Sequence, residues 1–282
     1  MKTKLFFFFI IVHFSLLNAQ KNGPKLIVRG DDMGYSHSGN LALLKSYKEG
    51  IETSIEVIVP APWFPEAVKM LNDNPNVDVG IHLALTSEWD NVKWRPVSDC
   101  PSIKNADGYF YPMVFPNPNY PKESIKENQW NIEDVEKEFR AQIELGLKYI
   151  PRISHLSAHM GCAHLSEEVN AMTKRLAKEY GLFYDMSEYN VERPSYDASP
   201  KTYEGRLKSF ITMLESLQPN KTYLFVEHPG LDNEELQAIS HIGYEDVAAH
   251  RQDVTNLFTD QKVKDKILEK GIQLVNYKDV SK

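Results

Sequence analysis

The sequence predicts an α/β protein built on a parallel sheet, either an open sheet or a barrel. Short apolar runs rich in β-branched residues alternate with amphipathic stretches along the whole chain, and there are seven such runs. This alternation is typical of βαβ units, whose strands are parallel. The 282 residues, of which 42% are hydrophobic and 25% charged, provide enough apolar material for the core of such a fold.

Each element follows from its local pattern. Asn131, followed by Asp134, is typical of the N-cap of a helix that extends through Tyr149. The other predicted helices are Ser36–Glu49, Phe64–Asn72, Ser166–Tyr180 and Tyr203–Leu217. The predicted strands are Lys25–Arg29, Thr53–Val59, Val77–Leu83, Arg152–Ser157, Leu182–Met186, Thr222–Glu227 and Ile272–Asn276.

The first nineteen residues have the layout of a secretory signal peptide. Lys2 and Lys4 precede an almost wholly apolar stretch from Leu5 to Leu17, and Ala19 provides a small residue for cleavage. A membrane anchor is the alternative, but this stretch is shorter than the ~20 residues that span a bilayer. We therefore expect export to the periplasm or the extracellular space, with residues 20–282 forming a single catalytic domain and no stable membrane insertion.

Charge and cysteine content exclude some classes of protein. The net charge of -7 argues against a nucleic-acid-binding protein, which normally has a basic surface. The two cysteines, Cys100 and Cys162, do not make a disulfide framework, although they could pair in an oxidising compartment. Cys162 lies near a histidine cluster, so a thiol ligand has to be weighed against a buried inert thiol, which we favour. The oligomeric state stays open, and a homodimer is compatible with the sequence.

Ionisable residues stand at or just after the ends of several predicted strands. Because the carboxyl ends of parallel strands share one edge of the sheet, we expect these residues to converge there. They are Asp31, Asp32, His82, His155, His159 and His228.

Asp31 and Asp32 follow the first predicted strand. Adjacent carboxylates leaving a strand point in different directions, so one can bind a metal ion while the other acts as a general base towards water. The alternative is that the pair caps the helix that begins at Ser36, with Gly34 as a turn residue.

The histidines leave similar alternatives open. His82, inside an apolar strand, is by itself more typical of a core residue than of a ligand. His155 and His159 have a frequent metal-ligand spacing, but the first is predicted on a strand and the second in a loop, so both need not bind one ion. His228 stands before Pro229 and Gly230 and could donate a proton to a leaving group.

An aspartate with two histidines suits Zn²⁺, Fe²⁺, Co²⁺ or Mn²⁺, and with fewer nitrogens Mg²⁺. Such a site activates water and polarises a carbonyl, and so hydrolyses amides or esters without a nucleophilic side chain. The sequence accordingly has no Gly-x-Ser-x-Gly elbow, Walker loop or Gly-x-Gly-x-x-Gly motif after a strand.

Six motifs lie in order along the chain: Leu26-Ile-Val-Arg-Gly-Asp-Asp-Met-Gly-Tyr-Ser, Gly80-Ile-His-Leu-Ala-Leu-Thr, Glu138-Phe-Arg-Ala-Gln, Ile153-Ser-His-Leu-Ser-Ala-His, Glu227-His-Pro-Gly and Arg251-Gln-Asp followed by Leu257. Over about residues 25–277 these motifs and their order resemble those of the YdjC-like carbohydrate deacetylases. The resemblance implies a distorted (β/α) barrel with about seven parallel strands, related to the NodB-type polysaccharide deacetylases. It also implies removal of acetyl groups from N-acetylated sugars or oligosaccharides.

The same resemblance implies a role for each site residue. One divalent ion, Mg²⁺ or Zn²⁺, would be held by Asp32, His82 and His159. Asp31 would be the catalytic base and His228 the catalytic acid. His155 and Arg251 would lie beside the site or the substrate. The chain departs from the family in having Ser157 and Ala158 before His159, which leaves the identity of the saccharide in doubt.

A long irregular segment, residues 86–130, is predicted to form a lid or a wall of the substrate site. Its Trp89 and Arg95 are candidates for contacts with a sugar ring and an anionic group, but packing of this loop onto the barrel explains them equally well. Two other functions stay open. One is a metal-dependent esterase or amidase acting on another acylated glycan, and the other is a non-catalytic glycan-binding protein.

Overall fold

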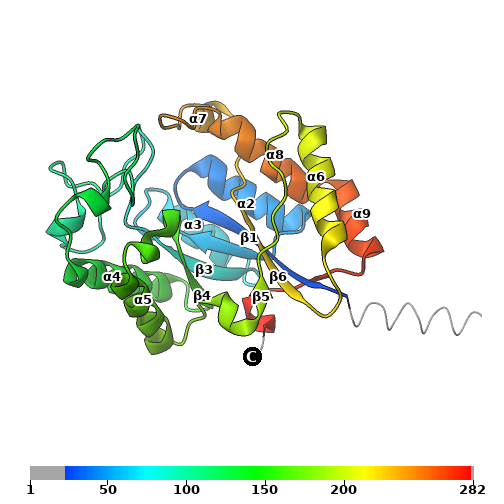
Figure 1. Ribbon diagram of the computed structural model, residues 1–282, viewed down its shortest axis with the longest axis horizontal. Coiled ribbons are helices and arrows are strands. Elements are labelled where there is room, and N and C mark those ends of the chain that lie inside the picture. Colours follow the sequence, from blue (N-terminus) through cyan, green and yellow to red (C-terminus); the bar gives the residue numbers. More distant parts are fainter. Residues whose placement is uncertain (1–22, 281–282) are drawn as a thin grey trace, which may run out of the picture.

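The structure, a computed structural model, describes residues 23–280 and contains one seven-stranded sheet in which every pairing is parallel (Figure 1). The strand order is β4-β3-β2-β1-β6-β5, and β7 pairs with the start of β1. The strands are β1 (Lys25–Met33), β2 (Ser54–Val57), β3 (Asp78–Leu83), β4 (His155–Ala158), β5 (Val191–Glu192), β6 (Thr222–Glu227) and β7 (Gln273–Leu274). The predicted parallel α/β fold with seven strands is confirmed.

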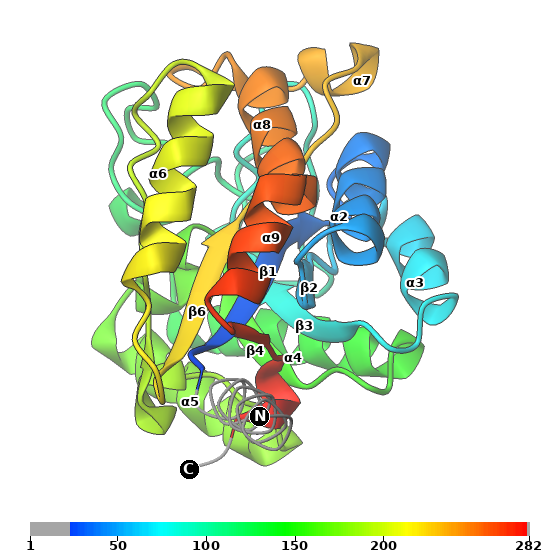
Figure 2. The same ribbon diagram turned by 90° about the vertical axis from the view of Figure 1, so that its right-hand side faces the viewer.

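The helices lie on the outside of the curled sheet, as Figure 2 shows for α6, α8 and α9 in front of β1 and β6. They are α2 (His37–Glu49), α3 (Phe64–Asn72), α4 (Ile132–Tyr149), α5 (Glu167–Tyr180), α6 (Tyr203–Ser216), α7 (Glu234–Gln237), α8 (Val247–Thr259) and α9 (Gln261–Glu269). Asn131 caps α4, since its side chain accepts a hydrogen bond from the Asp134 amide. The five helices predicted from the sequence are therefore present within a residue or two of their expected bounds.

The prediction of a strand over Leu182–Met186 is wrong. Only Phe183 in this segment forms a bridge, to His155, and a 3₁₀ turn, η4 (Met186–Tyr189), follows it. The fifth strand is instead the two-residue β5, which pairs with β6. Apolar side chains in this segment pack against the core without a ladder of backbone pairs, so hydrophobicity alone misplaced the strand. The sheet is therefore open between β4 and β5 in the part of the chain that the structure describes.

The first strand is longer than predicted, and this difference places the site. β1 continues to Met33, so Asp31 and Asp32 lie inside it and do not follow it. The register with β2 shifts between Gly30 and Met33, and Asp32 has a φ of 76°. Such a φ is uncommon for a residue other than glycine, and it marks a bulge that redirects the strand. As a result, both carboxylates turn towards the same histidine.

Segments outside the sheet frame this edge. Between β3 and α4 the chain forms only two 3₁₀ turns, η1 (Pro101–Ile103) and η2 (Ile125–Glu127), in the loops drawn in teal and green in Figure 1.

In residues 23–280 no helix has the length and apolar character needed to cross a membrane. The predicted signal peptide, residues 1–19, lies outside the described residues, so export stays a prediction, as does a homodimer.

Candidate active site

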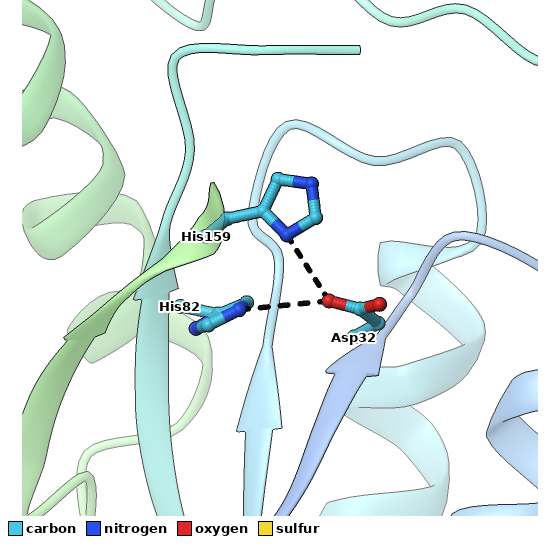
Figure 3. Close-up of side chains that lie close together, drawn as sticks. All are labelled: Asp32, His82 and His159. Carbon is cyan, nitrogen blue, oxygen red and sulfur yellow. Dashed lines mark ion pairs between the residues drawn. The ribbon is translucent and has the colours of Figure 1, made fainter. Parts of the chain in front are cut away.

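Three ligand-type side chains meet at the carboxyl edge of the sheet. Asp32 comes from β1, His82 from β3, and His159 from the first position of η3 (His159–His164), directly after β4 (Figure 3). One ligand atom from each lies within 4.8 Å of the others, and all three residues are buried. Asp32 Oδ1 is 3.5 Å from His82 Nε2 and 3.1 Å from His159 Nδ1. The tertiary structure therefore brings together the three predicted metal ligands.

One oxygen of this cluster has no other partner. Asp32 Oδ1 is buried and accepts no hydrogen bond from any residue in the range 23–280. The second oxygen, Oδ2, accepts a hydrogen bond from Arg251 Nη2 at 2.8 Å. A buried carboxylate oxygen without a hydrogen bond is costly, and in the metal-free protein the imidazole of His159, 3.1 Å away, is the group that offsets this cost; a bound cation would do so directly. One oxygen and two imidazole nitrogens form a donor set that fits a divalent ion such as Zn²⁺.

The charges around Asp32 keep it ionised. Burial by itself raises the pKa of this carboxyl, but Arg251 and His159 outweigh it and hold the pKa well below its usual range. Burial likewise lowers the pKa of His82, which favours a neutral ring. For His159 the carboxylates of Glu88 and Asp32 outweigh burial and raise the pKa to about 10. In the absence of an ion, His159 therefore supplies the positive charge at this point.

Asp31 lies beside the cluster and is held by a cation. Both of its oxygens accept hydrogen bonds from the guanidinium of Arg29, at 2.7 and 2.9 Å, and Oδ2 is 3.6 Å from His82 Nε2. The expectation that the two aspartates point in different directions is wrong, because the bulge at Asp32 brings both carboxylates towards His82. The alternative of a helix cap is excluded as well, since Ser36 caps α2 with its own hydroxyl.

His228 follows β6 at the rim of the same edge. Its side chain is 41% exposed, and its Nδ1 lies 3.6 Å from the carboxylate of Glu227. Desolvation alone would lower its pKa, but Asp32 and Glu227 outweigh this effect and raise it. A proton donor that is both accessible and readily protonated suits transfer to a leaving group.

His155 was predicted near the end of its strand, but it is the first residue of β4. It is fully buried and pairs with the carboxylate of Glu56, and its ring stacks on Tyr277 with centroids 3.4 Å apart. The three-residue spacing from His159 therefore does not place both imidazoles on one ion, because β4 extends the chain between them.

Trp89 and Arg95, the loop residues proposed for substrate contact, pack against other side chains of the protein. Trp89 is 1% exposed and lies beneath Arg251, whose guanidinium carbon is 5.2 Å from the ring centroid. Its burial favours the alternative that it packs the loop onto the sheet. Arg95 is exposed and contacts Tyr109 within the loop, with 4.3 Å between guanidinium carbon and ring centroid. Neither residue presents a contact with the metal cluster.

The loop nevertheless contributes to the site through Glu88. Its Oε2 lies 2.9 Å from His159 Nε2, and the carboxylate is buried. Because a carboxylate only accepts, His159 donates from Nε2 and turns Nδ1 towards Asp32. Sequence reasoning missed this role, together with those of Arg29 and Glu56. The available signal was a charged residue within an apolar strand, as in Val28-Arg29 and Ile55-Glu56-Val57.

Neither cysteine belongs to the site. Cys100 and Cys162 are free and buried. Burial raises the pKa of both thiols to about 12, and Cys162 donates its proton to the carbonyl of Leu83. These facts agree with the inert-thiol interpretation.

Comparison with known proteins decides the family. Residues 25–269 match the family model described as YdjC-like protein. The chain belongs to the YdjC-like family. Among its relatives, a carbohydrate deacetylase of Enterococcus faecalis is 26% identical over 92% of this chain and 99% of that protein. Carbohydrate deacetylase 2 of Listeria innocua is 30% identical over 159 residues, which cover 56% of this chain but only 58% of that protein.

Solved structures agree with this membership. A protein of Enterococcus faecalis V583, named provisionally as a cellobiose-phosphate cleavage protein, aligns with a TM-score of 0.72 and 25% identity over 91% of this chain and 98% of the other. A CE4 esterase of Streptococcus mutans aligns with a TM-score of 0.50 and 10% identity over 93% of this chain and 89% of the other. This second likeness concerns the fold alone, and it confirms the predicted relation to the NodB-type fold.

Proposed function

We propose that this protein is a metal-dependent hydrolase that removes acetyl groups from N-acetylated sugars or oligosaccharides. One observation carries the proposal: the atoms of Asp32, His82 and His159 converge within 4.8 Å at the sheet edge that also holds Asp31 and His228. Such a set combines ligands with candidates for a base and an acid. The names of the YdjC-like relatives support a carbohydrate as the acetylated substrate.

In this mechanism Asp32, His82 and His159 would hold one divalent ion, Mg²⁺ or Zn²⁺. When bound, such an ion polarises a carbonyl and makes water a better nucleophile at neutral pH. Arg251 takes up the charge of Asp32 Oδ2 and leaves Oδ1 as the binding atom. Glu88 turns Nδ1 of His159 towards the same point.

Asp31 then acts as the general base. Arg29 fixes the plane of its carboxylate through two hydrogen bonds, while each oxygen keeps further lone pairs that can accept a proton from the attacking water. His228 donates a proton to the amine as the carbon–nitrogen bond breaks. Asp32 and Glu227 raise the pKa of its ring, which favours the protonated form that this role requires.

Acetate release tests the proposal directly. We expect the protein to release acetate from N-acetylated amino-sugar oligomers, to lose this activity with a chelator and to regain it when a divalent ion is restored. Asp32→Ala should abolish both metal uptake and acetate release, while Asp31→Asn should keep metal uptake and lose about 10²–10⁴-fold in kcat. Full turnover by Asp32→Ala would disprove the mechanism.

The same assay separates the alternatives. Preferential release from O-acetylated sugars would indicate an esterase with the same site. Saccharide binding that a chelator leaves unchanged, without acetate release, would indicate a glycan-binding protein. We also propose that the enzyme is exported and acts on a glycan outside the cytoplasm, on the basis of residues 1–19, and N-terminal sequencing of the mature protein would test cleavage after Ala19.

A further inference from the structure

A buried hydrogen-bonded chain runs from the candidate metal cluster into the interior of the curled sheet. His82 Nδ1 lies 2.6 Å from the hydroxyl of Ser157, and this hydroxyl in turn contacts one carboxylate oxygen of Glu56. The other oxygen of Glu56 contacts Nε2 of His155. These four residues come from β2, β3 and β4, and all are buried. The chain joins a predicted ligand to a carboxylate that contacts no ligand itself.

The direction of each hydrogen bond follows from the number of protons available. A carboxylate only accepts, and the pKa of Glu56 is about 2 because His155 and Arg29 outweigh the effect of burial. Ser157 has one hydroxyl proton, which it donates to Glu56. Its oxygen can therefore only accept from His82, so the proton of the neutral His82 ring lies on Nδ1.

This assignment leaves the other nitrogen of His82 with a free lone pair. Nε2 is the atom that faces Asp32 Oδ1, at 3.5 Å. A ring nitrogen binds a metal ion only through its lone pair, and the hydrogen bond at the opposite nitrogen selects which one is free. With the opposite tautomer, a proton on Nε2 would point into the cluster and block the ion.

The sheet makes room for this chain at one position. Gly80 lies between Glu56 and His155 in the register of β2, β3 and β4. A Cβ at this position would come within 2.3 Å of the Glu56 carboxylate and 2.4 Å of His155 Nε2. Both neighbours are buried side chains in contact with each other, so a side chain at position 80 would have to displace them and break that contact. The glycine therefore permits the contact between Glu56 and His155.

His155 anchors the far end of the chain. Its Nδ1 lies 2.7 Å from the hydroxyl of Ser154, which donates to Asp78 at 2.7 Å. Both ring nitrogens thus face acceptors, and the ring is held between Glu56 and Ser154. It is therefore engaged in orienting Glu56, and both of its nitrogens face partners within the sheet, Ser154 and Glu56.

We infer that Glu56 is a positioning residue for metal binding, which acts through Ser157 to keep the proton of His82 on Nδ1. This inference rests on the proposed metal site, but the tautomer can be measured without metal. Outer hydrogen-bond partners of ligating histidines typically contribute 10–100-fold to metal affinity.

Ser157→Ala is the direct test, because it removes the hydroxyl that contacts His82 and little else. Titration calorimetry with Zn²⁺ alone should give a Kd 10–100-fold higher than that of the wild type. In the metal-free protein, ¹⁵N spectra of labelled histidines should show His82 with its proton on Nδ1 in the wild type and shifted towards Nε2 in the variant. Glu56→Gln should act in the same direction, since its amide can donate to Ser157 and reverse that bond.

Ser124→Ala is the matched control. It removes another buried serine hydroxyl, which donates to the carboxylate of Glu127 and contacts no member of the chain between His82 and His155. We expect it to lose about as much thermal stability as Ser157→Ala and to keep both the Zn²⁺ affinity and the His82 tautomer.

Three results would distinguish a failure of the inference about Glu56 from a failure of the proposed function. An unchanged tautomer and Kd in folded Ser157→Ala and Glu56→Gln would overturn the inference and leave the proposed function standing. Equal losses of affinity in Ser157→Ala and Ser124→Ala would also overturn it, because general destabilisation would then explain both. A wild-type protein that binds no Zn²⁺ but has the Nδ1 tautomer would overturn the proposed function alone.

Discussion

Glu56 and Glu52 lie four residues apart, yet they face opposite sides of the sheet and have opposite surroundings. Glu56 points inwards, where it contacts His155 and Ser157 and has a pKa of about 2. Glu52 is buried on the outer side, and neither of its oxygens has a hydrogen-bond partner within residues 23–280. Burial, with a smaller contribution from Asp31, raises the pKa of Glu52 well above its usual value.

This difference shows that the two faces of the sheet stabilise different protonation states of a buried carboxyl group. On the inner face the charged groups are paired, Asp31 with Arg29 on the same strand and Glu56 of β2 with His155 of β4. The hydrogen-bonded chain that contains Glu56 ends at His82, a residue of the site. On the outer face, helix α2 packs apolar side chains against the sheet, and Glu52 lies there against Gly30 and Leu43. The first environment stabilises a charge, whereas the second favours the neutral carboxyl.

The largest effect is expected from breaking the inner face at Arg29. Arg29→Met leaves Asp31 buried without its cation, and removal of one partner from such a pair costs about 3–5 kcal/mol. Chemical denaturation followed by circular dichroism would measure the loss. The double variant with Asp31→Asn should recover part of it, since no charge is then left unpaired. A loss below about 1 kcal/mol in Arg29→Met would show that the inner face does not depend on this pair.

A second prediction concerns the groups that orient the two histidines of the site, His82 and His159. His82 is oriented from within the sheet, whereas His159 is oriented by Glu88 of the loop after β3. Glu88→Gln should weaken Zn²⁺ binding about 10–100-fold, as measured by calorimetry, because the carboxylate no longer fixes the ring. Glu123→Gln, in the same loop, would be the control for a general effect of charge. If both variants bound Zn²⁺ as tightly as the wild type, the loop would have no part in the site.

The smallest effect is expected on the outer face, at Glu52. Glu52→Met removes an unpartnered polar group and should stabilise the protein by about 1 kcal/mol even at acidic pH. Because the folded-state pKa is raised, the wild type loses stability as pH rises from about 4.5, the unfolded value, towards the folded pKa. The gain from Glu52→Met should therefore grow with pH over this window. Thermal melts of wild type, Glu52→Met and Glu52→Gln between pH 4 and pH 8 would test it, and a constant difference would contradict the assignment.

Much of the fold could be predicted because it depends on local patterns. Phe64–Asn72 was predicted with the bounds that α3 has, since amphipathic spacing and a proline in the first turn are properties of the segment itself. The prediction of a strand over Leu182–Met186 was wrong because a strand needs a neighbouring strand to pair with. At this edge of the sheet, β6 pairs with Val191–Glu192 instead. A short apolar segment does not specify which neighbour it pairs with.

The site divides in the same way. The sequence by itself determined which residue types stand near the strand ends, and its resemblance to the YdjC-like family singled out Asp32, His82 and His159 among them as the metal set. Only the tertiary structure decided that the bulge at Asp32 turns both aspartates inwards, and that Glu56 and Glu88 orient the two histidines. Those contacts join residues 71 to 101 positions apart in the chain. The sequence specifies which side chains are present. Which partner holds the proton on one nitrogen of His82 or His159 depends on how distant segments pack together in the folded protein.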